Sequence, residues 1–120
     1  SYAENIMEYS KKLIGDGLSF SDEAKAEISE MVTTLNSLFN ASLGVFADKD
    51  MSMFAEVDIL EESVDQASRE LELRHVARLK KGECDPSVGS VYLQSVSDLE
   101  RIGDHITNIA YSTKNYRHYS

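Results

Sequence analysis

Residues that interrupt helices or cross-link chains are scarce in this sequence. Among its 120 residues it has one proline, six glycines, one cysteine and no tryptophan. The single cysteine excludes a disulfide within the chain and is typical of a reducing compartment. Because few residues favour turns, little of the chain is expected to be loop, and long helices are favoured.

Long apolar runs and a secretory pattern are also missing. No run approaches the roughly 18 apolar residues of a membrane-spanning helix, and no signal-peptide pattern opens the sequence. Basic residues do not balance the acids, because 12 Lys and Arg against 21 Asp and Glu give a formal net charge of −9. This charge argues against a nucleic-acid-binding protein, which would carry a basic face, and it is compatible with cation binding.

What the chain does contain is helical periodicity. Apolar residues recur at intervals of three and four through most of its length, which predicts amphipathic helices. A short helix is expected over residues 2–13, followed by three long helices of about 27 to 32 residues each. The long helices are expected from a Ser21 cap to about Asp48, from a cap at Asp48 or Asp50 to Lys81, and from Pro86 to about Arg117.

Short connections between long helices make consecutive helices antiparallel neighbours. The expected fold is therefore an all-α, antiparallel up-down bundle of three long helices with a short N-terminal helix. Residues 1–120 are enough for a single domain with one core. Residues 5–9 also echo residues 108–111. This echo indicates that residues 1–17 are the tail of a preceding repeat helix and that residues 21–118 form one three-helix repeat.

Polar residues form a separate row on the last long helix. Glu100, Asp104 and Asn108 recur every fourth residue, well round the helix from the apolar stripe, so they should face water or a partner. Glu61 and Asp65 have the same spacing on the preceding helix, and antiparallel packing would bring the two pairs together. Their oxygen atoms suit Mg²⁺, Mn²⁺, Ca²⁺ or iron, whereas zinc more often takes histidine or cysteine. These five residues are the candidate metal ligands.

The alternative interpretation of these acids is a solvated face. With 21 acids in 120 residues, acid pairs four residues apart arise often by chance, so the spacing alone does not identify a metal site. Two local features favour function. Glu100 and Asp104 repel each other across one helical turn, and Gly103 lowers helix stability by about 1 kcal/mol. A stretch that breaks two local rules is a candidate functional site.

Other reactive side chains have simpler interpretations. His75 follows Glu72 at the Glu-x-x-His spacing of ferritin-like di-iron bundles, but those bundles need two such motifs. A hydrogen-bonded packing histidine is therefore expected. Cys84 is expected in a loop with no histidine partner in view, which argues against a nucleophile. One basic stretch is interleaved with glutamates and is expected to be a solvated face. It comprises Arg69, Arg74, Arg78, Lys80 and Lys81.

The residues from Leu99 to Ala110 carry a specific resemblance. Their sequence, Leu-Glu-Arg-Ile-Gly-Asp-His-x-x-Asn-Ile-Ala, strongly resembles the signature of PhoU domains, the helical modules that regulate bacterial phosphate uptake. Upstream, Glu61-x-x-x-Asp65 falls where that family has its first acidic motif. The resemblance is greatest to the PhoU-like C-terminal region of sodium/phosphate cotransporters, through residues 75–84, Gly89, Tyr92 and Leu93.

This resemblance implies a regulator rather than an enzyme. In PhoU domains the paired acidic motifs bind metal ions, often iron or zinc clusters, on the bundle surface. Manganese and magnesium are further candidates here, and the ligands carried over are Glu61, Asp65, Glu100, Asp104 and Asn108.

The same resemblance implies where the protein acts. The implied partners are a phosphate transporter or its membrane portion, a sensor kinase, and a second copy of this single repeat that forms a homodimer, with no nucleic acid. The implied location is the cytoplasm, at the inner face of the inner membrane. Two alternatives stay open, namely a helical dimerisation module without metal and a ferritin-like di-metal oxidase.

Overall fold

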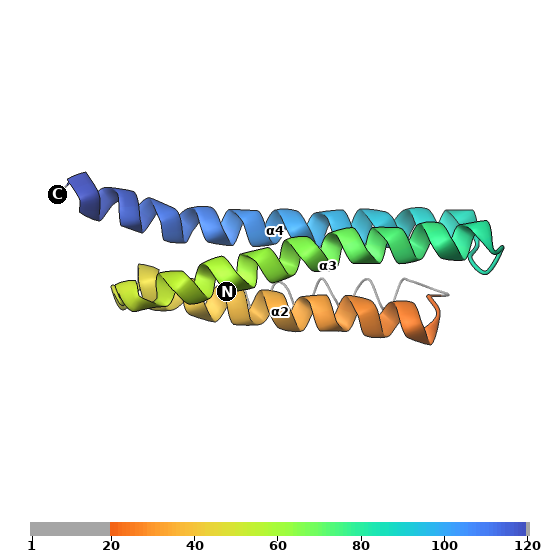
Figure 1. Ribbon diagram of the computed structural model, residues 1–120, viewed down its shortest axis with the longest axis horizontal. Coiled ribbons are helices and arrows are strands. Elements are labelled where there is room, and N and C mark those ends of the chain that lie inside the picture. The colour runs from red at the N-terminus through yellow and green to blue at the C-terminus, as the bar shows by residue number, and fades with distance from the viewer. Residues whose placement is uncertain (1–19, 120) are drawn as a thin grey trace.

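Three long helices lie side by side in the computed structural model, which describes the backbone of residues 20–119 and side chains as far as residue 113. Their direction alternates, since α2 runs from right to left in Figure 1, α3 from left to right and α4 from right to left. No strand occurs within the described range. The helices are α2 (Asp22–Phe46), α3 (Phe54–Lys80) and α4 (Pro86–Tyr119), with a 3-10 turn, η1 (Met51–Met53), before α3. The predicted all-α antiparallel bundle is confirmed. The expected helix over residues 2–13 and the echo in residues 1–17 lie outside the described residues.

The helix ends follow the capping residues. The Ser21 side chain accepts a hydrogen bond from the Ala24 amide at 3.1 Å, and Asp50 caps η1. Because η1 intervenes, α3 begins at Phe54, three residues after the start that a cap at Asp50 predicts. Gly82 has a positive φ of 69°, which ends α3, and Pro86 is the first residue of α4. The helices contain 25, 27 and 34 residues, a wider range than the sequence pattern predicts.

The core lies along the common axis of the bundle, and each long helix packs against both others. The fully buried apolar side chains include Ile28, Leu35, Leu38, Val57, Val64, Leu99 and Ile106. Each such side chain contributes about 1.5–3 kcal/mol by leaving water. Met51, Met53 and Phe54 pack against one end of this core, as their position at a helix start predicts.

Gly103 lies where α4 packs closely against both other helices. A Cβ at this position would come within 3.1 Å of Leu35 Cδ2 on α2 and 3.3 Å of Val64 Cγ1 on α3. Because glycine has no Cβ, the helices can pack at this separation. Packing therefore accounts for this glycine in the middle of α4, and the functional role of the stretch stays a prediction.

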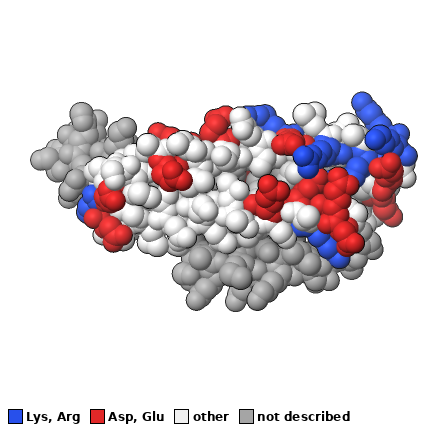
Figure 2. Space-filling view, turned by 60° about the horizontal axis from the view of Figure 1, so that its bottom comes forward, with Lys and Arg blue, Asp and Glu red and all other residues white. Residues whose placement is uncertain are grey.

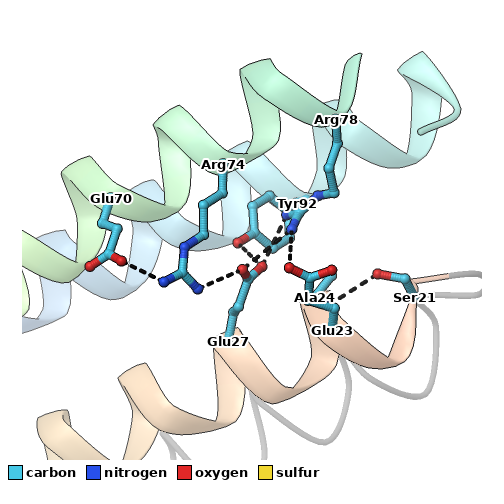
Figure 3. A network of polar contacts seen from close by, with 8 residues as sticks. All are labelled: Ser21, Glu23, Ala24, Glu27, Glu70, Arg74, Arg78 and Tyr92. Atoms are coloured by element: carbon cyan, nitrogen blue, oxygen red, sulfur yellow. Dashed lines mark hydrogen bonds and ion pairs between the residues drawn. The ribbon is translucent and has the colours of Figure 1, made fainter. Parts of the chain in front are cut away.

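A charged network crosses the bundle near the start of α2 (Figure 3). The Glu27 carboxylate, only 5% exposed, accepts hydrogen bonds from Arg78 Nη2 at 3.0 Å, Arg74 Nη1 at 3.1 Å and the Tyr92 hydroxyl at 2.8 Å. The Arg78 guanidinium also lies over the Tyr92 ring, 5.2 Å from its centroid. These four side chains come from all three helices, so the network ties α2, α3 and α4 together.

This network corrects the expectation that the whole basic stretch is a solvated face. Arg74 and Arg78 are one turn apart on the side of α3 that faces α2, and the Arg78 side chain is only 14% exposed. Lys80 and Lys81 are exposed, and basic side chains gather among acids at the end where α3 joins α4 (Figure 2). Burial alone raises the pKa of Glu27, but the hydrogen bonds from Arg78, Tyr92 and Arg74 outweigh it and lower the pKa overall.

Replacing two helical glycines with alanine distinguishes the effect of helix propensity on stability from the effect of packing. Either replacement adds about 1 kcal/mol of helix propensity. The atom nearest a Cβ at Gly44 is Met53 Cγ, 3.3 Å away on a flexible side chain, so Gly44→Ala should raise the free energy of unfolding. Gly103→Ala should lower it by about 1 kcal/mol, because two branched core side chains are crowded. Denaturant unfolding measures both, and an equal gain at both positions would contradict the packing role of Gly103.

Removing the charge of Glu27 leaves Arg78 buried without its main anion. Glu27→Gln should therefore lower the free energy of unfolding by about 3 kcal/mol at neutral pH, and the double variant Glu27→Met/Arg78→Met should recover much of this loss. Because the folded-state pKa of Glu27 lies below 4.5, its stabilisation is present above that value and is lost as the pH falls through the folded-state pKa. Thermal unfolding of both variants and the wild type across acid and neutral pH measures these effects. A double variant no more stable than Glu27→Gln would contradict the assignment.

Candidate functional site

The predicted acidic residues gather along one seam between α3 and α4, which we call the acidic face. Glu61 and Asp65 come from α3, and Glu100 and Asp104 from α4. The two helices are antiparallel neighbours, so the pairs lie within electrostatic reach of each other. Asp104 and Asn108 are exposed and the other three are half-buried. The acidic face is therefore at the bundle surface, as the angle between the polar row and the apolar stripe predicts.

Burial and mutual repulsion raise the pKa of two of these carboxyl groups, Asp104 and Glu61. Partial burial raises the pKa of Asp104, and the charges of Asp65 and Glu100 raise it further. Burial likewise raises the pKa of Glu61. A hydrogen bond from Tyr111 opposes this, and the charges of Asp65, Asp104 and Asp58 add to the increase, so the pKa lies above its usual value. The acidic face therefore carries charges that disfavour one another, which is a common property of cation-binding and catalytic sites.

Tyr111 and Asp58 extend the acidic face, and the sequence interpretation did not include Tyr111. The Tyr111 hydroxyl donates a short hydrogen bond to Asp58 and lies 3.3 Å from Glu61 Oε2. Its ring stacks on Phe54, with the centroids 6.4 Å apart and the planes 13° from parallel. The spacing in the sequence could have indicated Tyr111, because it follows Asp104 by seven residues and so lies on the same face of α4.

The carboxylates are gathered but not arranged as a cage. Within the part of the chain that the structure describes, no three His, Cys, Asp or Glu side chains are placed to hold a metal ion as they stand. The donor set itself is suitable, since four carboxylates and an amide oxygen are ligands for hard and borderline cations. The ligand role of these five residues stays a prediction.

Cys84 was expected to have no histidine nearby, but the structure places it close to His75. His75 is 2% exposed and packs on Tyr92, so the expected packing is confirmed. The expected hydrogen bond to its ring is not found among the described residues. Both His75 Nε2 and Cys84 Sγ, however, lie within 3.2 Å of the point that a Cβ on Gly89 would occupy. Cys84 therefore does have a histidine close by, because α4 folds back along α3 and brings the loop onto His75.

Residues 28–113, most of the chain, match the PhoU domain family. The chain belongs to the PhoU domain family. Members of this family are regulators rather than enzymes, so the expectation of a non-enzymatic protein is confirmed and a ferritin-like oxidase is set aside. Membership also agrees with the signature on α4 and with the acidic pair on α3.

A curated relative gives this PhoU domain a context. The chain is 25% identical over 103 residues to the phosphate-specific transport system accessory protein PhoU homolog 1 of Thermotoga maritima. The match covers 80% of this chain and 44% of that protein, so the chain spans less than half the length of its relative. No solved structure matches the chain. None of the helices described here is long and apolar enough to cross a membrane.

Neutralising Asp104 should stabilise this PhoU domain at neutral pH. A carboxyl group whose folded-state pKa is raised lowers stability when it is ionised, and the penalty disappears as the pH falls through that pKa. Asp104→Asn should therefore raise the free energy of unfolding by a few tenths of a kcal/mol at pH 7, since the group is exposed, and have no effect in acid. Thermal unfolding at both pH values measures this. Glu30→Gln, an exposed acid on α2 outside the acidic face, is the control, and an equal gain there would contradict the repulsion.

Proposed function

We propose that this PhoU domain is a regulatory module of phosphate transport whose acidic face binds a metal ion. The observation that carries the proposal is the meeting of two family motifs across α3 and α4. After partial burial, the charge of Asp65 on α3 contributes to the raised pKa of Asp104 on α4. A cation bound between these carboxylates would offset that repulsion.

The ligands in this proposal are Glu61, Asp65, Glu100 and Asp104, with the Asn108 amide oxygen beside them. An all-oxygen set favours iron, manganese or magnesium over zinc on chemical grounds. Because the side chains do not converge as they stand, binding requires Glu61 to turn from Tyr111 toward the ion. The surface position of Asp104 leaves part of the coordination sphere open to water or to a partner protein.

The proposed place of action is the cytoplasmic face of the inner membrane. The named function of the Thermotoga maritima relative, accessory to a phosphate-specific transport system, supports a phosphate transporter as partner, with a sensor kinase as a further one. The resemblance of residues 75–84 to cotransporter C-terminal regions supports a sodium/phosphate cotransporter in particular. Residues 21–118 would then form one PhoU repeat, which a second copy of the chain could complete as a homodimer.

Alanine at the two central aspartates tests the metal proposal. Asp65→Ala/Asp104→Ala should lose bound metal, measured by elemental analysis after dialysis against iron, manganese, zinc or magnesium, while circular dichroism shows unchanged helix content. Glu30→Ala/Glu56→Ala removes the same charge from exposed positions outside the face and should keep its metal. Equal metal content in the two double variants would mean that the assigned ligands are wrong.

An interaction module without metal is the second candidate, and one observation favours it. An almost entirely apolar cavity of about 230 Å³ opens between α2 and α4. Its lining includes Phe46, which is half exposed, and Leu43. The other apolar lining residues are Phe39, Ile106 and Ile109. Sedimentation analysis of the wild type and Phe46→Ser distinguishes the candidates. Self-association that is lost in Phe46→Ser, together with no bound metal, would favour this module over the metal proposal.

A further inference from the structure

Three exposed apolar side chains follow one another on the last two turns of α3. Leu73, Val76 and Leu79 are 71%, 42% and 37% exposed. They are spaced by three residues, so they lie next to one another on the surface of the helix. Single exposed apolar residues are common, whereas a contiguous group often marks an interaction surface. We call these three residues the apolar patch.

The apolar patch continues the line of the acidic face along α3. Asp65, Glu72 and Val76 follow one another at intervals of seven and four residues, which places them on one side of the helix. Glu72 is exposed and adds a carboxylate between the acidic face and the patch. On α3, acids therefore lead directly into exposed apolar side chains.

Contacts between α3 and α4 show which part of α4 borders the apolar patch. At one end the Tyr111 hydroxyl donates to Asp58, and at the other end the Arg78 guanidinium lies over the Tyr92 ring. Because the helices are antiparallel neighbours (Figure 1), these two contacts fix their register. The half-buried Leu93 comes directly after Tyr92 and therefore lies across the seam from the apolar patch.

The seam between α3 and α4 thus has two halves of different chemistry. Carboxylates line the half that begins at Glu61, and apolar side chains line the half that ends at Leu79. These two residues are about 27 Å apart along α3 at 1.5 Å per residue, which is the length of a helix of about 18 residues. An amphipathic helix that lies along two packed helices buries its apolar side against them.

The acids decide which occupant this seam fits. An anionic lipid surface would bring negative charge against Glu72 and the acidic face, and the same face of a second copy would bring the same acids. A helix that carries Lys or Arg in line with its apolar residues is complementary to both halves. Charge complementarity therefore favours a basic, amphipathic helix.

We propose that the seam between α3 and α4 is the docking site for one helix of a partner protein. This helix has two or three Leu- or Ile-type side chains against the apolar patch and Lys or Arg side chains against the acidic face. The proposal rests on the regulatory role proposed above, for which it gives the chemistry of the partner, but it does not rest on the metal ion. Burial of the apolar patch stabilises the complex, and the charges fix its register.

A fluorescent peptide of about 20 residues tests this docking directly. One half of its helix face carries leucines and the other half lysines, and the buffer contains a chelator. Fluorescence anisotropy should show saturable binding at micromolar concentration, with one peptide per chain, and added salt should weaken it. A peptide with glutamates in place of the lysines should not bind. Because the chelator removes metal ions, a failure of docking is distinct from a failure of metal binding.

Two matched double variants locate the peptide on the domain. Leu73→Ser/Val76→Ser should weaken binding by about tenfold or more, because two apolar contacts are lost. Ile59→Ser/Val91→Ser removes side chains of similar exposure, 61% and 43%, and should bind as the wild type does. Ile59 lies on the side of α3 that borders α2, and Val91 is two residues from Leu93 and so lies on the opposite side of α4.

The acidic half has its own variant and readout. Asp65→Asn/Asp104→Asn should weaken binding at low ionic strength and remove most of its salt dependence, since screened charges act there. Equal affinity of the two apolar double variants, equal binding of the lysine and glutamate peptides, or no binding of the lysine peptide would each overturn the proposal.

Sedimentation tests the other occupants of the seam. Self-association of the wild type that Leu73→Ser/Val76→Ser abolishes would assign this face to a second copy of the chain. Cosedimentation with phosphatidylglycerol vesicles that the same variant abolishes would assign it to a lipid surface. Either result would overturn the docking of a partner helix, whereas a monomer that stays apart from the vesicles and binds the lysine peptide supports it.

Discussion

The close approach of three helices at Gly103 is the constraint on which both packing and site geometry depend. With no side chain there, Leu35 and Val64 fill the space against the α4 backbone, and α3 and α4 run close together. Asp104 is the next residue, so the same contact that completes the core brings its carboxylate toward Asp65 on the surface. The family signature thus combines an inward glycine for packing with an outward acid for charge, one position apart.

Periodicity and capping residues were sufficient to predict the helices, their order and most of their ends, although η1 moves the start of α3 to Phe54. Ser21, Gly82 and Pro86 act locally, within one turn of the position they mark, so a single sequence reveals them. The row of acids was also readable, because a helix fixes which residues share a face. Whether α3 and α4 present these faces to each other depended on the antiparallel pairing, which the short loop determines.

What sequence reasoning missed depends on contacts between distant residues. Glu27 looks like any other acid of a first helix, and only its register against Arg74 and Arg78, 47 and 51 residues later, makes it a buried anion. The same holds for Cys84 and His75, which become neighbours only because Gly89 leaves room between them. Charge and residue type were visible in each case, but the angle at which the helices face one another was not.

Repulsion at the acidic face couples cation binding to helix packing. In the absence of a cation, Tyr111 supplies the donor that Asp58 and Glu61 lack, and its ring is held against Phe54 at the start of α3. A cation bound as proposed competes with that hydroxyl for Glu61 and also removes the repulsion between Asp65 and Asp104. Both effects act on the contact between the two helices. Occupancy of the site would therefore change how firmly α4 is held beyond Tyr111, which is a direct physical route from an ion to a partner protein.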